Sequence, residues 1–491
     1  MAKGWLAPRR RGVVGKVPAV LVALLLLGSV LYTCQAFQYF LHDDEGGYAY
    51  AAWRISQGEV PYRDFLTPQM PAFLYWGGLV VRLFGRSFVA LRAATAATML
   101  LAAVLLYATN RELFGRRVAL LSMGLFLVEP NAFHNARFFR PEAYMLVFQM
   151  AGFYCFVLGE KRKRLGYIGL ASVFFGLSIL SKLFGALPLG GCFLYLLYAY
   201  RREGRSARSV LREGLALGLP ALILVGAMAV LFTYLTPYFF TAVFEHHTMQ
   251  GATLAAAERL RKGIDYYRAY IQSQPFAIGL AVFGAWLALR RDRALPSLLV
   301  CQAPTALLFL VLSRDLQLRH LTYLAPALAT LAALVLAWVS ASQPQVPLPW
   351  RRGLGPALAL VLALAAVFPW MGRNASDAAK EEHDSPRITA LIQALAGPDD
   401  LVVSDYPGLN FLSNRRTTYW AAGLSGRAAR SGQIRGAALI DEIERRNVAV
   451  ILVRTLGPDP QMTEMVDYAG FRRYVQQHFA LVDRYECTYR E

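Results

Sequence analysis

Residues 17–41 read VPAVLVALLLLGSVLYTCQAFQYFL, and residues 42–45, which follow directly, read HDDE. An uncharged run of this length is long enough to cross a lipid bilayer as a helix. The basic residues that precede it are Lys3, Arg9, Arg10, Arg11 and Lys16. Because positively charged flanks stay on the cytoplasmic side of a membrane, we predict an uncleaved first span with its N-terminus in the cytoplasm.

The rest of the chain repeats this pattern of apolar runs. Of the 491 residues, 56% are hydrophobic and 17% are charged, whereas soluble domains are about 45–50% apolar and about 25% charged. A soluble enzyme, a disulfide scaffold and a disordered chain are therefore excluded. The runs predict a polytopic α-helical membrane protein with about eleven transmembrane helices. After the first span, these are Phe88–Thr109, Val118–Phe133, Glu142–Gly159, Leu165–Phe184, Ala186–Tyr200, Leu215–Thr236, Pro275–Leu289, Ala294–Ser313, Leu321–Ser340 and Leu354–Met371.

The net charge of +19 comes from short basic clusters between the apolar runs. This placement is typical of cytoplasmic loops and not of a nucleic-acid-binding face, so we expect membrane lipids and no nucleic acid as partners. An odd number of spans places the C-terminus outside the cytoplasm. We therefore predict a multi-pass protein of the inner (plasma) membrane whose C-terminal domain is periplasmic or extracellular.

The polar tail, residues 372–491, predicts a small C-terminal α/β domain. Leu401–Ser404 and Val448–Val453 resemble buried strands, and Gly436–Arg446 between them resembles a helix. Strands that alternate with helices favour a parallel pair. The predicted division is thus a transmembrane domain at 1–371, which includes a long first outer loop at 42–87, and the tail domain at 372–491.

The first outer loop opens with three acids, Asp43, Asp44 and Glu45, at the membrane surface. Unpaired acids are costly there, although a solvated start of the loop is the alternative interpretation. A helical stretch at 47–55 and a turn at 58–65 follow. Pro71–Phe84 is amphipathic, and we expect it to lie along the interface. A carboxylate would then be held where lipid and water meet.

Three further polar groups fall on the predicted outer side. In the first, Arg137 and Arg140 are three residues apart and would share a face on a helical turn. Pro141 and Glu142 suit the start of a helix, so capping alone would also explain Glu142. In the second, Lys182 ends the fifth span and could simply snorkel to the surface. The third holds Arg314, Arg319 and Tyr323, between the ninth and tenth predicted spans.

Cations beside carboxylates on one face predict an anion site that includes a base. Cations stabilise a departing phosphate, and a carboxylate accepts the proton of an acceptor hydroxyl or amine. A donor used outside the cytoplasm is best carried by a lipid. We therefore predict transfer of a sugar from a polyprenyl-phosphate donor. The candidate donor phosphate-binding residues are Arg137, Arg140, Lys182, Arg314 and Arg319.

Several of these segments resemble one family. Asp44-Glu45, Tyr48, Gly58, Pro61-Tyr62, Asp64, Leu83-Phe84-Gly85 and Arg92 are similar to the first-loop pattern of the GT-C membrane glycosyltransferases. The likeness is greatest to the branch of protein O-mannosyltransferases, aminoarabinose (lipid A) transferases and their bacterial relatives (glycosyltransferase family 39-like). Weaker matches are Arg137 to Glu142, Ser181-Lys182 with Gly185, and Arg319 through Pro326. The resemblance covers roughly residues 20–340.

The resemblance implies an inverting transfer with Asp44 as the catalytic base. We expect a lipid, glycan or protein acceptor, and expect Glu45 to position either Asp44 or that acceptor. It implies Glu142 as a second acid where the family usually has aspartate. A divalent cation, Mg²⁺ or Mn²⁺, is a possible cofactor, with Asp43, Asp44 and Glu142 as possible oxygen ligands. The expected substrate-binding residues are Asp43, Tyr48, Tyr62, Asp64, Glu142, His134 and Tyr323.

Two other functions stay open at this point. A lipid-linked-sugar flippase or transporter would explain many spans and outer charges, but not the acidic first loop or the tail. A polysaccharide ligase or polymerase would transfer whole chains from a pyrophosphate-linked donor. We also expect the outer loop at 237–274 to close over the donor, and a metal at His246-His247 is a minor alternative.

Overall fold

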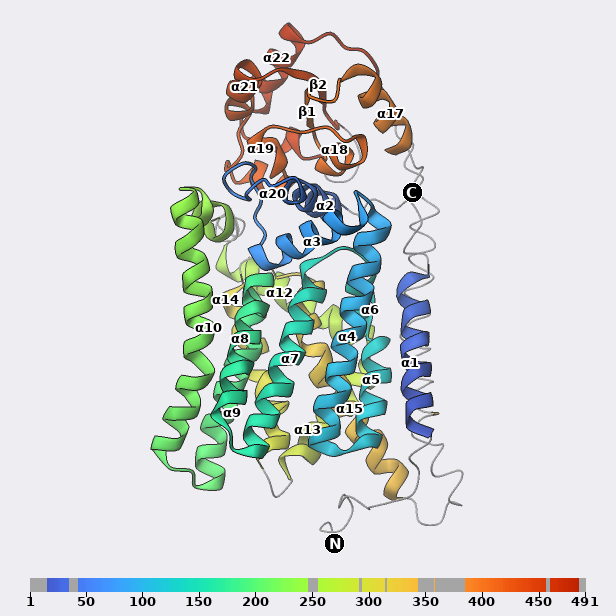
Figure 1. The fold of residues 1–491 in the computed structure, drawn as a ribbon, viewed down its shortest axis with the longest axis vertical. Helices are drawn as coiled ribbons and strands as arrows, with labels where there is room; N and C mark the ends of the chain where they lie inside the picture. The colour runs from blue at the N-terminus through green and yellow to red at the C-terminus, as the bar shows by residue number, and fades with distance from the viewer. Residues whose placement is uncertain are drawn as a thin grey trace.

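The structure is a computed structural model that describes residues 16–34, 43–245, 255–290, 294–313, 316–342, 357, 385–455 and 460–484. An upright helical bundle carries the C-terminal segment, residues 385–484, on one end (Figure 1). We call this the upper end of the bundle and the opposite one the lower end. The bundle helices are α1 (Lys16–Thr33), α4 (Phe88–Phe114), α5 (Arg116–Leu127), α7 (Pro141–Arg162), α8 (Leu165–Ser181), α9 (Ala186–Glu203), α10 (Ala207–Leu235), α13 (Pro275–Leu289), α14 (Ala303–Leu312) and α15 (Ala325–Ser342).

Within the described residues, six helical stretches are long and apolar enough to cross a membrane. They are Phe88–Phe114, Pro141–Arg162, Leu183–Glu203, Ala207–Leu235, Leu295–Leu312 and Leu318–Ala341. A seventh results if α12 (Ala256–Ser273) and α13, which meet at a bend of 95°, count as one span. The count of eleven stays a prediction, because α1 and α8 are shorter apolar helices and nearly all of Leu354–Met371 lies outside the described residues.

Short 3-10 and π turns extend or connect several bundle helices. η1 (Leu183–Gly185) precedes α9, and η2 (Thr241–Glu245) follows α10. η3 (Leu295–Leu298) and η4 (Val300–Gln302) lead into α14, so the predicted span Ala294–Ser313 is a chain of short turns and one helix. η5 (Leu318–Leu324) leads into α15 and packs beside α6.

The predicted single span Val118–Phe133 is wrong, because α5 ends at Leu127 and α6 (Pro130–Arg137) begins a new helix. Glu129 caps α6, since its carboxylate accepts the Ala132 amide at 2.7 Å and Pro130 occupies the first turn. The buried Glu129 also accepts hydrogen bonds from Tyr270 and Gln274 of the α12–α13 bend, at 2.9 and 2.8 Å. The break brings His134 and Arg137 to the upper end of the bundle.

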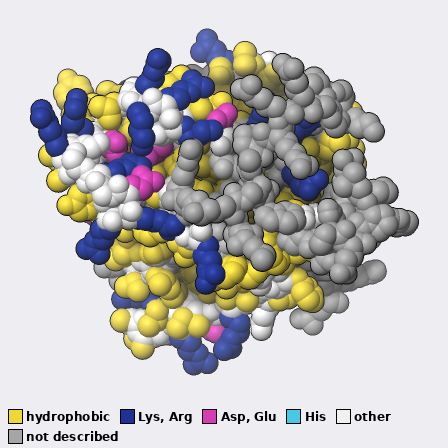
Figure 2. All heavy atoms as spheres, turned by 90° about the horizontal axis from the view of Figure 1, so that it is seen from below, with side chains coloured by type: hydrophobic (Ala, Val, Ile, Leu, Met, Phe, Trp, Pro, Cys, Tyr) yellow, Lys and Arg dark blue, Asp and Glu magenta, His cyan; other side chains and the backbone are white. Residues whose placement is uncertain are grey.

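The lower end of the bundle is rich in basic side chains, as Figure 2 shows for the described residues. They come from the last turns and C-caps of bundle helices, among them Lys161, Arg162, Lys163, Arg201, Arg202 and Arg290. Arg205 is instead largely buried there and pairs with Glu160 at 2.5 Å and with Glu213 at 3.0 Å. These pairs tie α7 to the start of α10.

Two helices of the first long loop lie across the upper end, between the bundle and the C-terminal segment (Figure 1). α2 (Asp43–Ser56) and α3 (Pro71–Phe84) confirm the predicted helices of this loop. Gly77 and Gly78 let α3 pack closely on Phe139 and Ile55. Leu83 and Phe84 at the end of α3 are 65% and 70% exposed, as expected for a helix that lies along an interface.

The C-terminal segment contains the predicted parallel strand pair, β1 (Leu401–Ser404) and β2 (Val448–Leu452). The register pairs Val403 with Ile451, with an irregularity after Leu401. The predicted helix between the strands is α21 (Gly436–Arg445). The other elements are α17 (Ser385–Leu395), α18 (Pro407–Ser413), α19 (Tyr419–Ala422), α20 (Gly426–Arg430), η6 (Met462–Glu464) and α22 (Tyr468–His478).

This segment is joined to the first loop by backbone and side-chain hydrogen bonds. The Thr417 amide donates to the Tyr50 hydroxyl at 3.0 Å. The Tyr419 hydroxyl donates to the Tyr62 carbonyl at 2.8 Å, and the Leu66 amide donates to the Tyr419 carbonyl at 3.1 Å. The C-terminal segment therefore packs on α2 and on the turn that joins α2 to α3.

Gly46 allows this close approach, and a substitution there tests it. A Cβ atom at Gly46 would meet the Tyr406 ring and lie 2.7 Å from Gly408 Cα, whereas nothing lies within 4 Å of a Cβ at Gly47. We expect Gly46→Ala to lower the free energy of unfolding by about 1–3 kcal/mol through overpacking. Thermal unfolding in detergent and protease cleavage of the C-terminal segment would measure the effect. Equal behaviour of Gly46→Ala and the control Gly47→Ala would contradict the docking described here.

Candidate functional site

Asp44 lies at the start of α2, between two arginines from distant parts of the chain. Its Oδ2 atom is 2.7 Å from Nη2 of Arg319 in η5 and 3.7 Å from Nη1 of Arg140, which precedes α7. The Asp44 side chain is 35% exposed, whereas Arg140 is almost fully buried. Neighbouring cations favour the charged form of a carboxylate, and the exposed side of Asp44 leaves it accessible to an acceptor group.

A second ion pair lies beside the first. The Lys182 ammonium donates to Oε1 of Glu142 at 2.8 Å, and Glu142 is buried. Arg140 and Arg319 are also close enough to Glu142 to interact with it electrostatically. Glu142 thus holds Lys182 as well as starting a helix, and Lys182 points to a partner instead of snorkelling. We call Asp44, Arg140, Glu142, Lys182 and Arg319 the charged cluster; its net charge is one positive unit.

The backbone explains how Arg140 reaches the charged cluster while Arg137 does not share its helix. α6 ends at Arg137, Phe138 is extended, and Arg140 is extended before Pro141. Proline disfavours the helical conformation in the residue before it. The expectation that Arg137 and Arg140 lie on one helical turn is therefore wrong. Arg137 donates to the Cys34 carbonyl at 2.8 Å and packs over the Phe133 ring, towards α1.

Glu45, the residue after Asp44, anchors the start of α2 to the bundle. It is fully buried, and its carboxylate pairs with Nε and Nη2 of Arg92 in α4 at 2.9 and 2.5 Å. The same carboxylate accepts the Phe139 amide at 2.8 Å. Glu45 therefore links the start of α2 to α4 and to the stretch before Arg140. The sequence placed Arg92 in the family pattern but gave it no role, since nothing in its neighbourhood reveals a partner 47 residues away.

Of the other predicted residues, Tyr48 lies next to the charged cluster and Tyr323 lies behind Phe184. Tyr48 is one turn after Asp44 and packs edge-on against Phe73. Burial, and then the nearby Asp44 carboxylate, raise the pKa of the Tyr48 phenol above its usual range. Tyr323 packs against Phe184 and Phe309, and the Lys182 ammonium lies 5.4 Å from the centre of the Phe184 ring. Tyr48 thus lies beside Asp44, whereas Tyr323 is linked to Lys182 only through the Phe184 ring.

Tyr62 and Asp64 have their described partners elsewhere. Tyr62 is buried, packs edge-on against Phe232 and Phe239, and its carbonyl accepts the Thr236 and Tyr419 hydroxyls. Asp64 accepts the Val60 amide at 2.8 Å and pairs with Arg63, which lowers the pKa of the carboxyl group. Both residues shape the turn between α2 and α3, and the structure does not bring them to the charged cluster.

Some predicted residues cannot be placed. Arg314, His42, His246 and His247 lie outside the described residues, as does the side chain of Asp43. The predicted loop at 237–274 is described only in part, as η2 and α12 with residues next to them. Their predicted roles stay predictions.

A cleft lies beside the charged cluster and shares Arg319 with it. The cleft has a volume of about 220 Å³ and is lined by Asn131, His134, Tyr266, Gln317, Leu318 and Arg319. Arg319 belongs to both. Burial, followed by the Arg140 and Arg319 cations, holds the pKa of His134 well below its usual range, so this imidazole is neutral. The sequence identified His134 and Arg319, but not Asn131, Tyr266 or Gln317.

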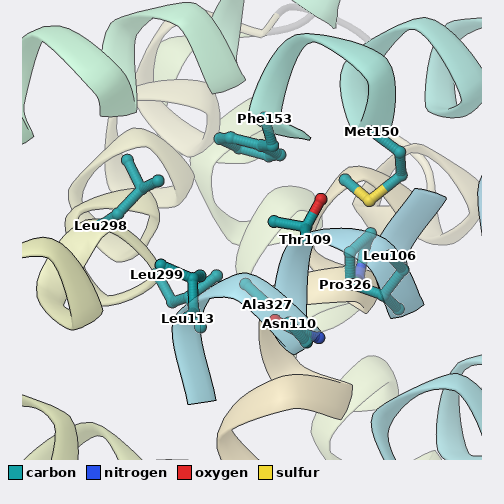
Figure 3. Close-up of a pocket in the computed structure, with 10 residues that line it drawn as sticks. All are labelled: Leu106, Thr109, Asn110, Leu113, Met150, Phe153, Leu298, Leu299, Pro326 and Ala327. Atoms are coloured by element: carbon teal, nitrogen blue, oxygen red, sulfur yellow. The ribbon is translucent and has the colours of Figure 1, made fainter. Parts of the chain in front are cut away.

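A second void lies between the middle helices of the bundle. Figure 3 shows the residues that surround it, which come from α4, α7, α15, η3 and Leu299. Its volume is about 10 Å³, room for about one water molecule. Its lining is almost entirely apolar, so this void is a packing defect and not a substrate site.

The predicted metal ligands are mostly engaged with cations. Asp44 pairs with two arginines and Glu142 with Lys182. Within the described part of the chain, no group of three or more histidine, cysteine, aspartate or glutamate side chains could hold a metal ion. Two carboxylates already paired with cations do not fit a Mg²⁺ or Mn²⁺ site, and we derive no step through a metal.

Comparisons with known proteins agree with this architecture. The family model of dolichyl-phosphate-mannose-protein mannosyltransferases matches residues 67–232. ArnT from Cupriavidus metallidurans bound to undecaprenyl phosphate is 16% identical, with a TM-score of 0.64 over 82% of this chain and 86% of that one. The archaeal oligosaccharyltransferase AglB from Archaeoglobus fulgidus, in complex with an inhibitory peptide and a dolichol-phosphate, is 15% identical, with a TM-score of 0.55 over 88% and 68%. No curated protein sequence matches the chain significantly.

These likenesses confirm the resemblance on which the sequence analysis drew. The chain has the GT-C glycosyltransferase fold, and its family match spans the end of the first loop and the helices from α3 to most of α10. The match includes Arg140, Glu142 and Lys182 of the charged cluster.

Proposed function

We propose that this protein is an inverting glycosyltransferase that moves a sugar from a polyprenyl-phosphate donor to a lipid, glycan or protein acceptor of the cell envelope. The observation that carries the proposal is the position of Asp44, a partly exposed carboxylate, beside the cations Arg140, Lys182 and Arg319. ArnT and AglB, which share the fold, are described with undecaprenyl phosphate and dolichol-phosphate. By analogy with these two proteins, we propose a sugar linked to a polyprenyl phosphate as the donor.

The geometry supports a direct displacement. Asp44 accepts the proton of the acceptor hydroxyl or amine as that atom attacks the anomeric carbon of the sugar. The bond from that carbon to the phosphate oxygen breaks, and its electron pair leaves with polyprenyl phosphate. Lys182, Arg319 and Arg140 stabilise the negative charge that develops on the phosphate. Attack from the face opposite the phosphate inverts the anomeric configuration.

Ion pairs with carboxylates hold Lys182 and Arg319 in place for binding the donor phosphate. Glu142 holds the Lys182 ammonium, and Asp44 holds the Arg319 guanidinium, so neither side chain has to be ordered when the donor binds. One net positive charge remains for the phosphate. Arg137 is the more distant candidate, because its described contacts lie towards α1.

The charge distribution supports an orientation. The lower end carries the basic turns of Figure 2, which predicts that it faces the cytoplasm. The charged cluster and the C-terminal segment then face the periplasm or the exterior of an inner (plasma) membrane. Residues 1–371 would form the catalytic domain. Residues 372–491 would form an extracytoplasmic domain that covers it.

Two alternatives are weaker on this geometry. A transporter of lipid-linked sugars has no need of a base held between two arginines at one end of the bundle. A polysaccharide ligase or polymerase would use a pyrophosphate-linked donor, whereas ArnT and AglB are described with the monophosphates undecaprenyl phosphate and dolichol-phosphate.

The test is a transfer assay with purified protein in proteoliposomes and a panel of undecaprenyl-phosphate sugars, with and without EDTA. We expect wild type to release free undecaprenyl phosphate from at least one donor, in step with glycosylation of an added membrane extract. Movement of an intact donor across the bilayer without cleavage of its glycosidic bond would support the transporter instead. Loss of turnover with EDTA would show a metal requirement that the described carboxylates do not explain.

A further inference from the structure

Helix α12 carries an exposed apolar strip along one side. Leu260, Ile264 and Ile271 are 43%, 45% and 46% exposed. At 3.6 residues per turn, these three side chains fall within about 40° of one another around the helix axis. We call them the apolar edge of α12. Apolar side chains that form a continuous exposed strip mark a contact with a partner or with a membrane.

The opposite side of α12 is fixed to the bundle. A Cβ atom at Gly263 would lie 2.6 Å from the Leu310 side chain, so α12 packs closely on α14. The Tyr267 hydroxyl donates to a carbonyl of α14 at 2.7 Å, and the Tyr270 hydroxyl donates to Glu129 at 2.9 Å. These contacts hold the helix in one rotational setting, in which the apolar edge faces away from α14.

The bend between α12 and α13 sets the direction of α12. α13 begins beside Gln274, which donates to Glu129 at the start of α6 near the upper end. It ends at the lower end, where the Leu289 carbonyl accepts a hydrogen bond from Arg202 at 2.6 Å. α12 meets α13 at 95°. A helix at this angle to one that crosses a bilayer lies along the membrane surface.

The charges of α12 follow the apolar edge in an order that suits a lipid surface. Arg268 and Arg261 are exposed and lie about 40° and 60° further around the axis than Ile264. The acids Asp265 and Glu258 lie beyond them, on the side away from the apolar edge. With the edge in the acyl chains, both guanidinium groups reach the level of the lipid headgroups, where they form strong hydrogen bonds to phosphate.

We propose that the apolar edge of α12, together with Arg261 and Arg268, docks on the bilayer leaflet at the upper end and binds anionic lipid headgroups there. This inference goes beyond the proposed function. The same helix contributes Tyr266 to the cleft that contains Arg319, and Tyr270 to the Glu129 cap of α6. The lipid surface thereby supports one wall of the cleft beside the charged cluster.

Cysteines introduced singly at Ile264 and Asp265 report on this docking in the full-length protein in proteoliposomes. The probe is an uncharged polyethylene glycol maleimide that does not cross the bilayer. Its rate constant at each position is measured from the loss of the unmodified peptide in mass spectrometry, so the native cysteines do not interfere. The rate constant does not depend on the fraction of protein that faces outwards.

The expected rates differ between the two positions and between two kinds of vesicle. In phosphatidylcholine with about one quarter phosphatidylglycerol, we expect Ile264→Cys to react about tenfold more slowly than Asp265→Cys, because only the first is immersed. In phosphatidylcholine alone, this difference should shrink about threefold or more, because the arginines lose their anionic partners. Equal rates in the anionic vesicles would overturn the inference, since the apolar edge would then be in water.

Arginine variants separate anionic lipid from other partners of the apolar edge. Arg261→Gln with Arg268→Gln should abolish the effect of phosphatidylglycerol. The matched control, Arg445→Gln with Arg446→Gln, removes two exposed arginines of the C-terminal segment and should retain it. A protection of Ile264→Cys that is the same in both vesicles, or that is lost when the protein is diluted in the bilayer, would overturn the inference. The second result would assign the edge to another copy of the chain. Sugar transfer is not measured here, so failure of the proposed function would leave this result standing.

Discussion

Asp44→Asn is expected to lower kcat/KM for sugar transfer about 10²–10⁴-fold, because the variant removes the base but not the site. Asparagine has nearly the same shape and still accepts a hydrogen bond from Arg319, which lies 2.7 Å from Asp44 in the wild type. It cannot take a proton from the acceptor. Binding of undecaprenyl phosphate should be retained or become tighter, since the variant removes a negative charge from a site for phosphate.

The measurement combines turnover with donor binding. Turnover is followed as release of undecaprenyl phosphate, and binding as thermal stabilisation of the protein in detergent by undecaprenyl phosphate alone. Loss of turnover with intact binding supports Asp44 as the base. A variant that turns over as fast as wild type would show that Asp44 is not the base and that the proton leaves by another route.

Asp64→Asn is the informative control for this experiment. Asp64 lies in the same outer loop, but its carboxylate is bound to Arg63 and to the Val60 amide. The structure therefore predicts turnover within a few-fold of wild type. A large loss would instead support the role in substrate binding that the sequence predicts for this residue.

The sequence predicts the helices of this fold well because membrane helices are encoded locally. Length and apolar composition place α4 and α7, and flanking charge places their ends. The prediction of a single span at Val118–Phe133 was wrong because it also relied on local hydropathy. The sequence stays apolar across the helix break that Glu129 and Pro130 create. A hydropathy pattern does not reveal that a side chain such as Glu129 caps the N-terminus of a new helix.

The site could be predicted only as a set of residue types on one face. The sequence indicated that Asp44, Arg140, Glu142, Lys182 and Arg319 share the outer side, and the structure brings all five together. It could not indicate which carboxylate pairs with which cation, because the partners are 40 residues apart or more. Tyr266 and Gln317 were missed for the same reason, since an amide or phenol in a polar stretch carries no signal of its own.

Glu45→Ala is expected to lower the free energy of unfolding by about 3–5 kcal/mol, the largest stability effect we predict. The alanine leaves the Arg92 guanidinium without the carboxylate that it contacts at 2.9 and 2.5 Å, and the Phe139 amide without its acceptor. Glu45 is completely buried, so water cannot take the place of the lost carboxylate in these hydrogen bonds. Thermal unfolding in detergent measures the loss, with Glu112→Gln as control. Glu112 and Lys161 are about one-third exposed, and such surface pairs contribute about 0–1 kcal/mol.

The double variant Glu45→Leu with Arg92→Met separates stability from positioning. Replacing both members of a buried ion pair by apolar residues is often neutral or stabilising, so we expect the double variant to recover much of the lost stability. Activity should not recover with it. The bond from Glu45 to the Phe139 amide links the start of α2 to the stretch that carries Arg140, and leucine cannot restore it. Full recovery of turnover would show that Glu45 stabilises the bundle without positioning Asp44. Recovery of stability alone would assign to Glu45 the alignment of the base with its two arginines.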